Sequence, residues 1–249
     1  MMKNKQKKKG FFFRIIKSAI SVKYKKRKII GRENIPEEPS IIVGNHAQMH
    51  GPLAAEILFP YKRYTWCAGE VMNIKEAPSY TYVDFWAHKP KWSKWFYKIL
   101  SYIISPLCVY IFKNGDTIPV YKDSRGILTF KHSVQAMKNG AHIIIFPEGR
   151  TEFNNIVNDF QDKFVDLARF YYKSTGKELL FVPMYNAPKL KTVVYGKPIK
   201  FDAKIPIDQH RVEICEYLKA EITKLAKDLP EHIVVPYANI PKRKYPKSK

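Results

Sequence analysis

Short β-rich runs alternate with helical patterns from residue 31 onward, and this alternation restricts the fold more than any other feature of the chain. Six runs are typical of strands: residues 40–44, 64–68, 117–121, 141–146, 179–184 and 192–196. Between and after them, apolar residues recur at helical spacing over 124–139, 160–171 and 214–229. Strands that alternate with helices predict an α/β domain, with a mixed sheet flanked by helices. The chain has 249 residues, 45% of them hydrophobic, which is enough to bury a core.

Positive charge is concentrated at the two ends of the chain. Residues 1–28 hold 12 Lys and Arg side chains and no acid, and residues 242–249 hold five more. The formal net charge is +22, yet the rest of the chain carries 27 basic and 22 acidic residues, which is close to balance. We therefore expect three parts: a basic, amphipathic membrane-binding segment over 1–30, an α/β domain over 31–229 and a basic tail over 230–249. Four prolines in the tail indicate an extended conformation.

The segment 11–22 lies directly between the N-terminal lysine clusters. On a helical projection its apolar residues fall within an arc of about 200°, with Arg14 and Lys17 on the opposite side. These two charges interrupt the apolar run that a signal peptide or a spanning helix needs. The pattern favours a helix that lies on an anionic membrane surface at its cytoplasmic face, as a peripheral or monotopic anchor. A helix packed on the domain with a solvated basic face is the alternative.

A second apolar stretch, residues 99–112, follows a segment rich in Trp, Tyr and Phe. As a helix its 14 residues would reach about 21 Å, short of the roughly 30 Å of a hydrocarbon layer. An interfacial aromatic belt and a buried core helix both fit this composition. Three separate cysteines without a CxxC pair, Cys67, Cys108 and Cys215, indicate neither a disulfide framework nor a thiolate metal site. We therefore expect a reducing compartment.

Polar residues follow two of the expected strands at the points where ligand sites form in α/β proteins. Asn45 and His46 come directly after the run 40–44, and Pro52 opens a helical pattern soon afterwards. The run 141–146 leads into a turn, 147–151, that contains Glu148, Gly149 and Arg150. An arginine with a carboxylate at a strand exit offers a phosphate clamp or an ion pair.

The order of these blocks resembles the glycerolipid acyltransferase family, which includes the 1-acylglycerol-3-phosphate acyltransferases. Asn45-His46 matches the start of an NHxxxxD block, and Phe146-Pro147-Glu148-Gly149 matches an FPEG block about a hundred residues later. Two further matches are Gly115 with Ile118-Pro119-Val120-Tyr121-Lys122, and Val182-Pro183-Met184. The likeness covers roughly residues 31–200.

The resemblance implies a membrane-associated enzyme that moves a fatty acyl group from a thioester to the hydroxyl of a glycerol phosphate or lysophospholipid. It makes His46 the general base, with Glu148 as the second catalytic residue. Acceptor and phosphate binding fall to Asn45, Lys122, Gly149 and Arg150. The donor is acyl-CoA or acyl carrier protein, and neither a cofactor nor a metal is implied.

Two positions depart from the family pattern. Gly51 stands where the family has the Asp that orients the histidine, and Lys122 stands where it has an Arg. Glu70, Glu148 or a backbone carbonyl are the candidates to orient His46 instead. Because Gly51 precedes Pro52, we expect a turn built for a residue without Cβ.

Three other functions remain open at this point. The missing Asp is compatible with a catalytically inactive relative that only binds lipid. The overall charge suggests a nucleic-acid-binding protein, although the balanced body and the lack of an RNA or DNA motif speak against one. His46 and His50 have the i, i+4 spacing of zinc ligands, but Ala47 stands where a metalloprotease needs Glu and no third ligand is evident.

Overall fold

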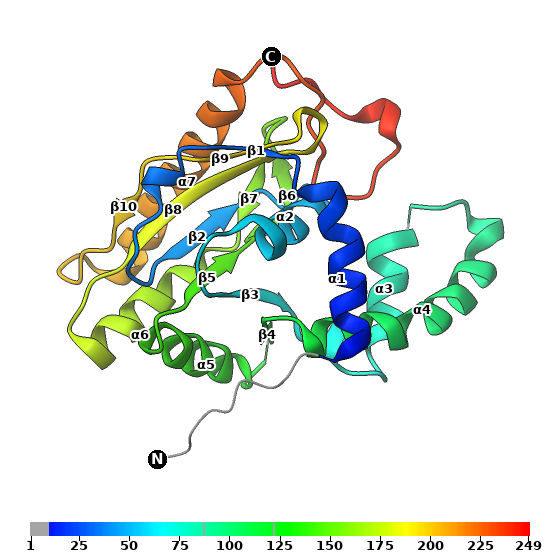
Figure 1. The fold of residues 1–249 in the computed structure, drawn as a ribbon, viewed down its shortest axis with the longest axis horizontal. Coiled ribbons are helices and arrows are strands. Elements are labelled where there is room, and N and C mark those ends of the chain that lie inside the picture. Colours follow the sequence, from blue (N-terminus) through cyan, green and yellow to red (C-terminus); the bar gives the residue numbers. More distant parts are fainter. Residues whose placement is uncertain (1–9, 87, 122) are drawn as a thin grey trace.

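The computed structural model describes residues 10–86, 88–121 and 123–249. Expectations for Lys122 and for the lysines of 1–9 fall outside these residues. The main sheet has the strand order β1-β9-β8-β2-β5-β3-β4, and β10 pairs with β8 (Figure 1). Its strands are β1 Lys28–Ile30, β2 Ile41–Gly44, β3 Arg63–Ala68, β4 Thr117–Val120, β5 His142–Ile145, β8 Leu180–Ala187, β9 Thr192–Tyr195 and β10 Ile199–Lys200. A second, two-stranded sheet pairs β6 Glu148–Phe153 with β7 Asn158–Phe160.

The directions of the strands bring several chain segments to one edge of the sheet. Strands β8, β2, β5, β3 and β4 are parallel neighbours, so their carboxyl ends lie together. Strand β9 is antiparallel to β8 and parallel to β1, so the amino end of β1 lies at that same edge. The expected mixed sheet is confirmed, and this carboxyl edge is where a site is expected.

The two faces of the sheet are covered by different helices because side chains alternate along each strand. Ile41 and Val43 of β2 point to one face, where they join the core formed with α5 Gly126–Lys138, α6 Asp166–Thr175 and α7 Ile207–Asp228. Ile42 points to the other face and packs with α2 His50–Leu58 and the end of α1 Phe11–Tyr24. Strands β2 and β5 are buried along their full length, as parallel strands between two layers of helices are.

A helical hairpin projects beside the sheet between β3 and β4. It consists of α3 Ala77–Trp86 and α4 Lys94–Asn114, and α1 runs between this hairpin and the sheet (Figure 1). Short 3₁₀ helices complete the connections: η1 Arg32–Asn34, η2 Gly69–Met72, η3 Lys91–Ser93, η4 Asp162–Val165, η5 Pro188–Leu190 and η6 Lys242–Lys244.

Two of the differences from the sequence expectations concern the surroundings of the carboxyl edge. The segment 147–151, expected to be a turn, enters β6, because Glu148 and Phe153 pair with β7 in an antiparallel hairpin. Residues 230–249, expected to be extended, fold back on the domain. There an antiparallel bridge joins Ile233 to Lys247, Val234 is buried, and the hydroxyl of Tyr185 lies 2.9 Å from His232 Nε2. We call residues 230–249 the C-terminal segment.

Candidate active site at the carboxyl edge of the sheet

The carboxyl edge brings the sequence blocks into direct contact. Asn45 and His46 follow β2, Glu148 begins β6 just after β5, and Asn186 lies at the end of β8. The backbone N–H of His46 donates a hydrogen bond to Glu148 Oε2, at 2.5 Å. Two blocks that are about a hundred residues apart in the chain therefore meet.

A backbone carbonyl orients the imidazole of His46. Nδ1 of the ring donates a hydrogen bond to the carbonyl oxygen of Gln48. Ala47 and Gln48 both have positive φ, 45° and 54°, and this left-handed turn carries the Gln48 carbonyl back to the ring. With the proton held on Nδ1, the lone pair lies on Nε2, where a general base needs it. Of the candidates considered for the missing Asp, the structure thus shows the carbonyl.

Aromatic rings enclose the same imidazole. Its centroid lies 5.4 Å from that of Phe146 and 5.1 Å from that of Tyr237, a residue of the C-terminal segment. Burial lowers the pKa of His46 to about 4, and the hydrogen bond to Gln48 acts in the opposite direction. His46 is therefore neutral at physiological pH, and its lone pair is available. Because a carbonyl is a dipole and not a charge, it stabilises the imidazolium less than a carboxylate would.

Glu148 holds the His46 loop and not the ring. Its side chain is buried; Oε2 accepts from the His46 N–H, and Oε1 accepts from the Asn158 N–H at 2.9 Å. Burial raises the pKa of Glu148 to about 7, while the two hydrogen bonds lower it. The carboxyl thereby links the loop after β2 to strand β7. In this structure Glu148 acts on His46 through the backbone.

The four residues expected to bind the acceptor do not form one cluster in the described part of the structure. The amide of Asn45 forms two hydrogen bonds with the backbone of Asn186: Nδ2 donates to its carbonyl at 3.1 Å, and Oδ1 accepts from its N–H at 2.7 Å. Asn45 therefore ties the end of β2 to β8. Gly149 lies in β6 beside Glu148. The side chain of Arg150 and the whole of Lys122 lie outside the described part of the chain.

Gly51 contacts the His46 loop so closely that a side chain does not fit. A Cβ at this position would lie 2.7 Å from the carbonyl oxygens of Asn45 and His46 and 2.8 Å from the ring of Phe146. The Gly51 N–H also donates to the His46 carbonyl at 2.9 Å. Close approach of backbone, and not a positive φ, is what requires glycine here.

The two histidines with zinc-ligand spacing bind other partners. Nδ1 of His50 lies 2.8 Å from the hydroxyl of Tyr24, while Nδ1 of His46 is bound to Gln48. Among the residues that the structure describes, no group of three or more His, Cys, Asp or Glu side chains is arranged to hold a metal ion.

Sequence reasoning missed Gln48, Tyr237 and Tyr245. The side-chain amide of Gln48 donates to the Tyr245 hydroxyl at 2.6 Å, so the C-terminal segment contacts the residue that orients His46. The run Ile233-Val234-Val235 was the available signal, since three consecutive apolar residues are unusual in an extended, solvated tail.

An exposed apolar surface lies on α1 and α4, and we call it the α1–α4 face. The two helices touch where the ring centroids of Phe12 and Tyr110 lie 6.2 Å apart. Helix α1 buries Phe13 and Tyr24 against the protein and exposes the other side of its apolar arc. The exposed members of the face are Phe11, Phe12, Ile15 and Val22 on the first helix and Trp92, Trp95, Phe96, Ile99, Tyr102, Ile103 and Leu107 on and just before the second.

Helix α4 exposes large apolar side chains on its outer side and buries Ser101, Ser105 and Val109 on its inner side. Ser101 and Ser105 are buried, and Ser105 Oγ lies 3.2 Å from Thr81 Oγ1 of α3, whereas Trp92 is 81% exposed and Ile103 is 67% exposed. This arrangement excludes the buried core helix that the composition allowed. Within the described residues, Lys91–Asn114 is long and apolar enough to cross a membrane by length and composition. Its partner α3 has ten residues, about 15 Å, so the hairpin does not span and return.

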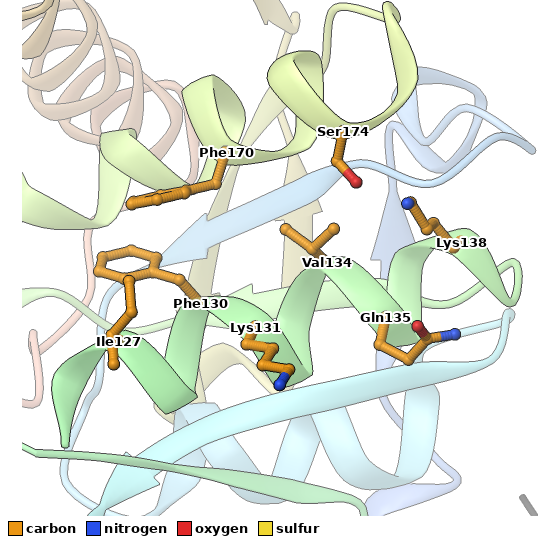
Figure 2. A pocket seen from close by; sticks show the side chains of 8 residues that line it. All are labelled: Ile127, Phe130, Lys131, Val134, Gln135, Lys138, Phe170 and Ser174. Carbon is orange, nitrogen blue, oxygen red and sulfur yellow. The ribbon is translucent and has the colours of Figure 1, made fainter. Parts of the chain in front are cut away.

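An open groove between α5 and α6 is separate from the candidate site. It has a volume of about 290 Å³, and the rings of Phe130 and Phe170 stack within it at 5.0 Å (Figure 2). None of its lining residues belongs to the His46 loop or to the β6–β7 hairpin.

No family model matches the chain, and no curated protein matches it. The chain is similar in structure to the 1-acyl-sn-glycerophosphate (LPA) acyltransferase PlsC from Thermotoga maritima, with 15% sequence identity. The match covers 86% of this chain and 81% of that one, with a TM-score of 0.48.

Proposed function

We propose that this protein is a membrane-associated acyltransferase that moves a fatty acyl group from a thioester to the hydroxyl of a glycerol phosphate or lysophospholipid. One observation carries the proposal: His46 lies at the carboxyl edge of the sheet with Nδ1 held by the Gln48 carbonyl, which leaves Nε2 as a base. The order of the sequence blocks, which the fold brings to this edge, supports the same reaction class.

The chemistry requires one base and no covalent intermediate on the protein. Nε2 of His46 takes the proton of the acceptor hydroxyl as its oxygen attacks the thioester carbonyl. The tetrahedral intermediate collapses, the carbon–sulfur bond breaks, and the departing thiolate takes the proton from His46. Glu148 keeps the loop in place during these steps through its hydrogen bond to the His46 N–H.

The α1–α4 face supports the membrane part of the proposal. Large exposed apolar patches on a protein mark contact with a membrane or a partner. Trp92 and Trp95 are interleaved here with Lys91, Lys94 and Lys98, and this mixture of Trp and Lys is typical of the interface between acyl chains and headgroups. We propose an anionic cytoplasmic leaflet as the site of action.

The acceptor and the donor each need a binding group on the protein. Arg150, Lys122 and Gly149 would receive the phosphate of the acceptor, since Arg grips phosphate with two donors. The donor would be acyl-CoA or acyl carrier protein. No cofactor and no metal take part.

A catalytically inactive, lipid-binding relative is the second candidate. Gly51 in place of the orienting Asp favours it, and so does the Tyr237 ring that covers His46. The two candidates share the membrane surface and differ in whether His46 turns over a thioester.

Thiol release distinguishes them. The full chain is incubated on anionic vesicles with an acyl-CoA and either lysophosphatidic acid or glycerol 3-phosphate, and free thiol is measured with a chromogenic disulfide. We expect acceptor-dependent release that His46→Ala abolishes, with circular dichroism unchanged. His132→Ala, which removes an exposed histidine of α5, is the matched control and should keep the rate. Vesicle binding without any His46-dependent release would favour the inactive relative.

A further inference from the structure

An arginine lies at the carboxyl edge, three strands away from β2. Arg27 directly precedes β1; its Nη1 donates to Asn186 Oδ1 at 3.2 Å, and its guanidinium carbon lies 4.1 Å from the centre of the Tyr24 ring. The Nε atom is buried and has no hydrogen-bond partner among the residues that the structure describes. No carboxylate among the described residues forms an ion pair with Arg27. A partly buried guanidinium that lacks both a counter-ion and one of its hydrogen bonds is costly unless a ligand supplies them.

Two lysines add to the positive charge at this place. Lys23 lies in the last turn of α1 and Lys189 in η5, just after β8, and both side chains are exposed. Both act with Arg27 on His50, whose pKa is lowered first by burial and then by these three cations. Neither lysine forms an ion pair with a carboxylate in the described part of the chain. Arg27, Lys23 and Lys189 therefore all act electrostatically on His50, and no carboxylate among the described residues forms an ion pair with any of them.

A buried amide points to the same missing group. The side chain of Asn186 is fully buried; its Oδ1 accepts from Arg27, while its Nδ2 has no partner within the described part of the chain. A buried donor without an acceptor costs on the order of 1–3 kcal/mol, so a retained one indicates an acceptor that is present in the working protein. The backbone of Asn186 is bound to Asn45, which precedes His46. Asn186 therefore links Arg27, through its side chain, to the loop of His46, through its backbone.

We propose that Arg27, Lys23 and Lys189 form an anion site that binds a phosphate monoester, with Asn186 as a neutral donor beside it. A phosphate monoester fits because it carries close to two negative charges and several acceptor oxygens, which the guanidinium meets with directed donors and the lysines meet as point charges. The site does not use Arg150 and does not depend on the proposed transfer reaction. The phosphate belongs either to a soluble ester or to the headgroup of a membrane lipid. A lipid headgroup can reach the site because Lys23 lies on α1, the helix that also carries part of the α1–α4 face.

The imidazole of His50 is a built-in reporter for the test. A bound anion offsets the three cations, so the pKa of His50 should rise when phosphate binds. We would titrate His50 by NMR in the full chain with inorganic phosphate, with glycerol 3-phosphate, and with vesicles of phosphatidylcholine with or without phosphatidic acid. A response to the soluble anions identifies a soluble ester, and a response only to phosphatidic acid identifies a lipid headgroup.

Charge-matched variants separate the site from general electrostatics. The double substitution Lys23→Gln with Lys189→Gln should weaken anion binding, so that the anion concentration needed for a half-maximal His50 response rises about tenfold or more. The reason is that two of the three cations are lost. Lys224→Gln with Lys227→Gln, at exposed positions on α7, removes the same charge and should leave it unchanged. Absence of any His50 response to every anion, or equal weakening in the two double variants, would overturn the proposal. Thiol release by His46 is scored separately, so a failure here is distinct from a failure of the transferase proposal.

Discussion

Gly51 shows at the scale of one residue how the His46 loop depends on close backbone contact. Gly51→Ala would place a Cβ 2.7 Å from two carbonyl oxygens, so the loop must move or the helix must shift. We expect a loss of about 1–3 kcal/mol in the free energy of unfolding, measured by urea denaturation. Gly115→Ala is the control: the nearest atom to its Cβ would be 3.3 Å away, in extended backbone with φ −74°, and a much smaller loss is expected.

The same contact decides the result of introducing a carboxylate at position 51, where the acyltransferases that the sequence resembles have Asp. Gly51→Asp supplies a charge but also the Cβ that the loop does not accommodate, so we expect lower thiol release than in the unchanged protein. The assay is the one described for His46. A rate increase would mean that the loop moves easily and that a carboxylate is the better orienting group.

Glu148 should give the folded protein a recognisable pH dependence. Its pKa is raised to about 7 from an ordinary 4.5. As the pH rises above 4.5, the unfolded state therefore releases this proton while the folded state still holds it. The stability linked to this proton is fully present below about pH 4.5 and is lost as the pH rises through 7. In Glu148→Gln this titration is absent. The difference in unfolding free energy, unchanged protein minus variant, should therefore fall as the pH rises from 4.5 to 7.

Urea titrations of both proteins at several pH values check this prediction. His46 has the opposite effect, because its lowered pKa costs stability as the pH falls from 6.5 towards 4, but it is present in both proteins and cancels in the difference. A difference that is flat across the interval would show that Glu148 is ionised in the folded state.

Residue chemistry could be predicted only where it depends on local order in the chain. His46 and Glu148 were found because each follows a strand whose apolar run is evident. The partner of His46 was not, because the Gln48 carbonyl reaches the ring through a left-handed turn made by Ala47 and Gln48. Non-glycine residues rarely adopt that conformation, and the side chains of Ala47 and Gln48 do not predict it.

At the scale of elements, the C-terminal segment controls the surroundings of His46. Tyr237→Ala removes the ring that lies 5.1 Å from the imidazole and admits water. Since burial is the main cause of the low pKa, about 4, we expect the pKa of His46 to rise by about one unit or more towards 6.5. NMR titration of the imidazole measures this. Tyr245→Phe is the comparison: it removes the hydrogen bond from Gln48 but keeps the ring, so a smaller rise is expected.

Elements with a strong local signal were predictable, and elements defined by tertiary contacts were not. Strands β2 and β5 are continuous apolar runs, so their sequence alone indicates them. Strand β6 begins with Glu148-Gly149, residues that resemble a turn, and becomes a strand only because β7 pairs with it. The C-terminal segment has the composition of a tail, and its structure comes from Val234 and His232, which are buried against the domain.

For the whole molecule, the α1–α4 face is the surface that we propose contacts a membrane. Ile103→Asp places a charge at the centre of the exposed side of α4, where the side chain is 67% exposed. We expect binding to anionic vesicles to fall severalfold in sedimentation, while the free energy of unfolding changes by about 0.5 kcal/mol or less. Val212→Asp, on α7 at 61% exposure, adds the same charge away from the face and should bind like the unchanged protein. Equal losses in both variants would indicate attraction by net charge alone.

The outward apolar side of α4 also governs how the purified chain behaves in plain buffer. Without lipid, exposed Trp, Phe and Ile side chains would face water. Two molecules would remove this apolar area from water by packing their α1–α4 faces together. Sedimentation velocity should then show concentration-dependent association that mild non-ionic detergent reverses. Such assemblies would place α1 at the contact, next to the elements that hold His46. Any thiol release measured in detergent-free buffer would then come from the aggregate, and the measured rate would depend on the protein concentration.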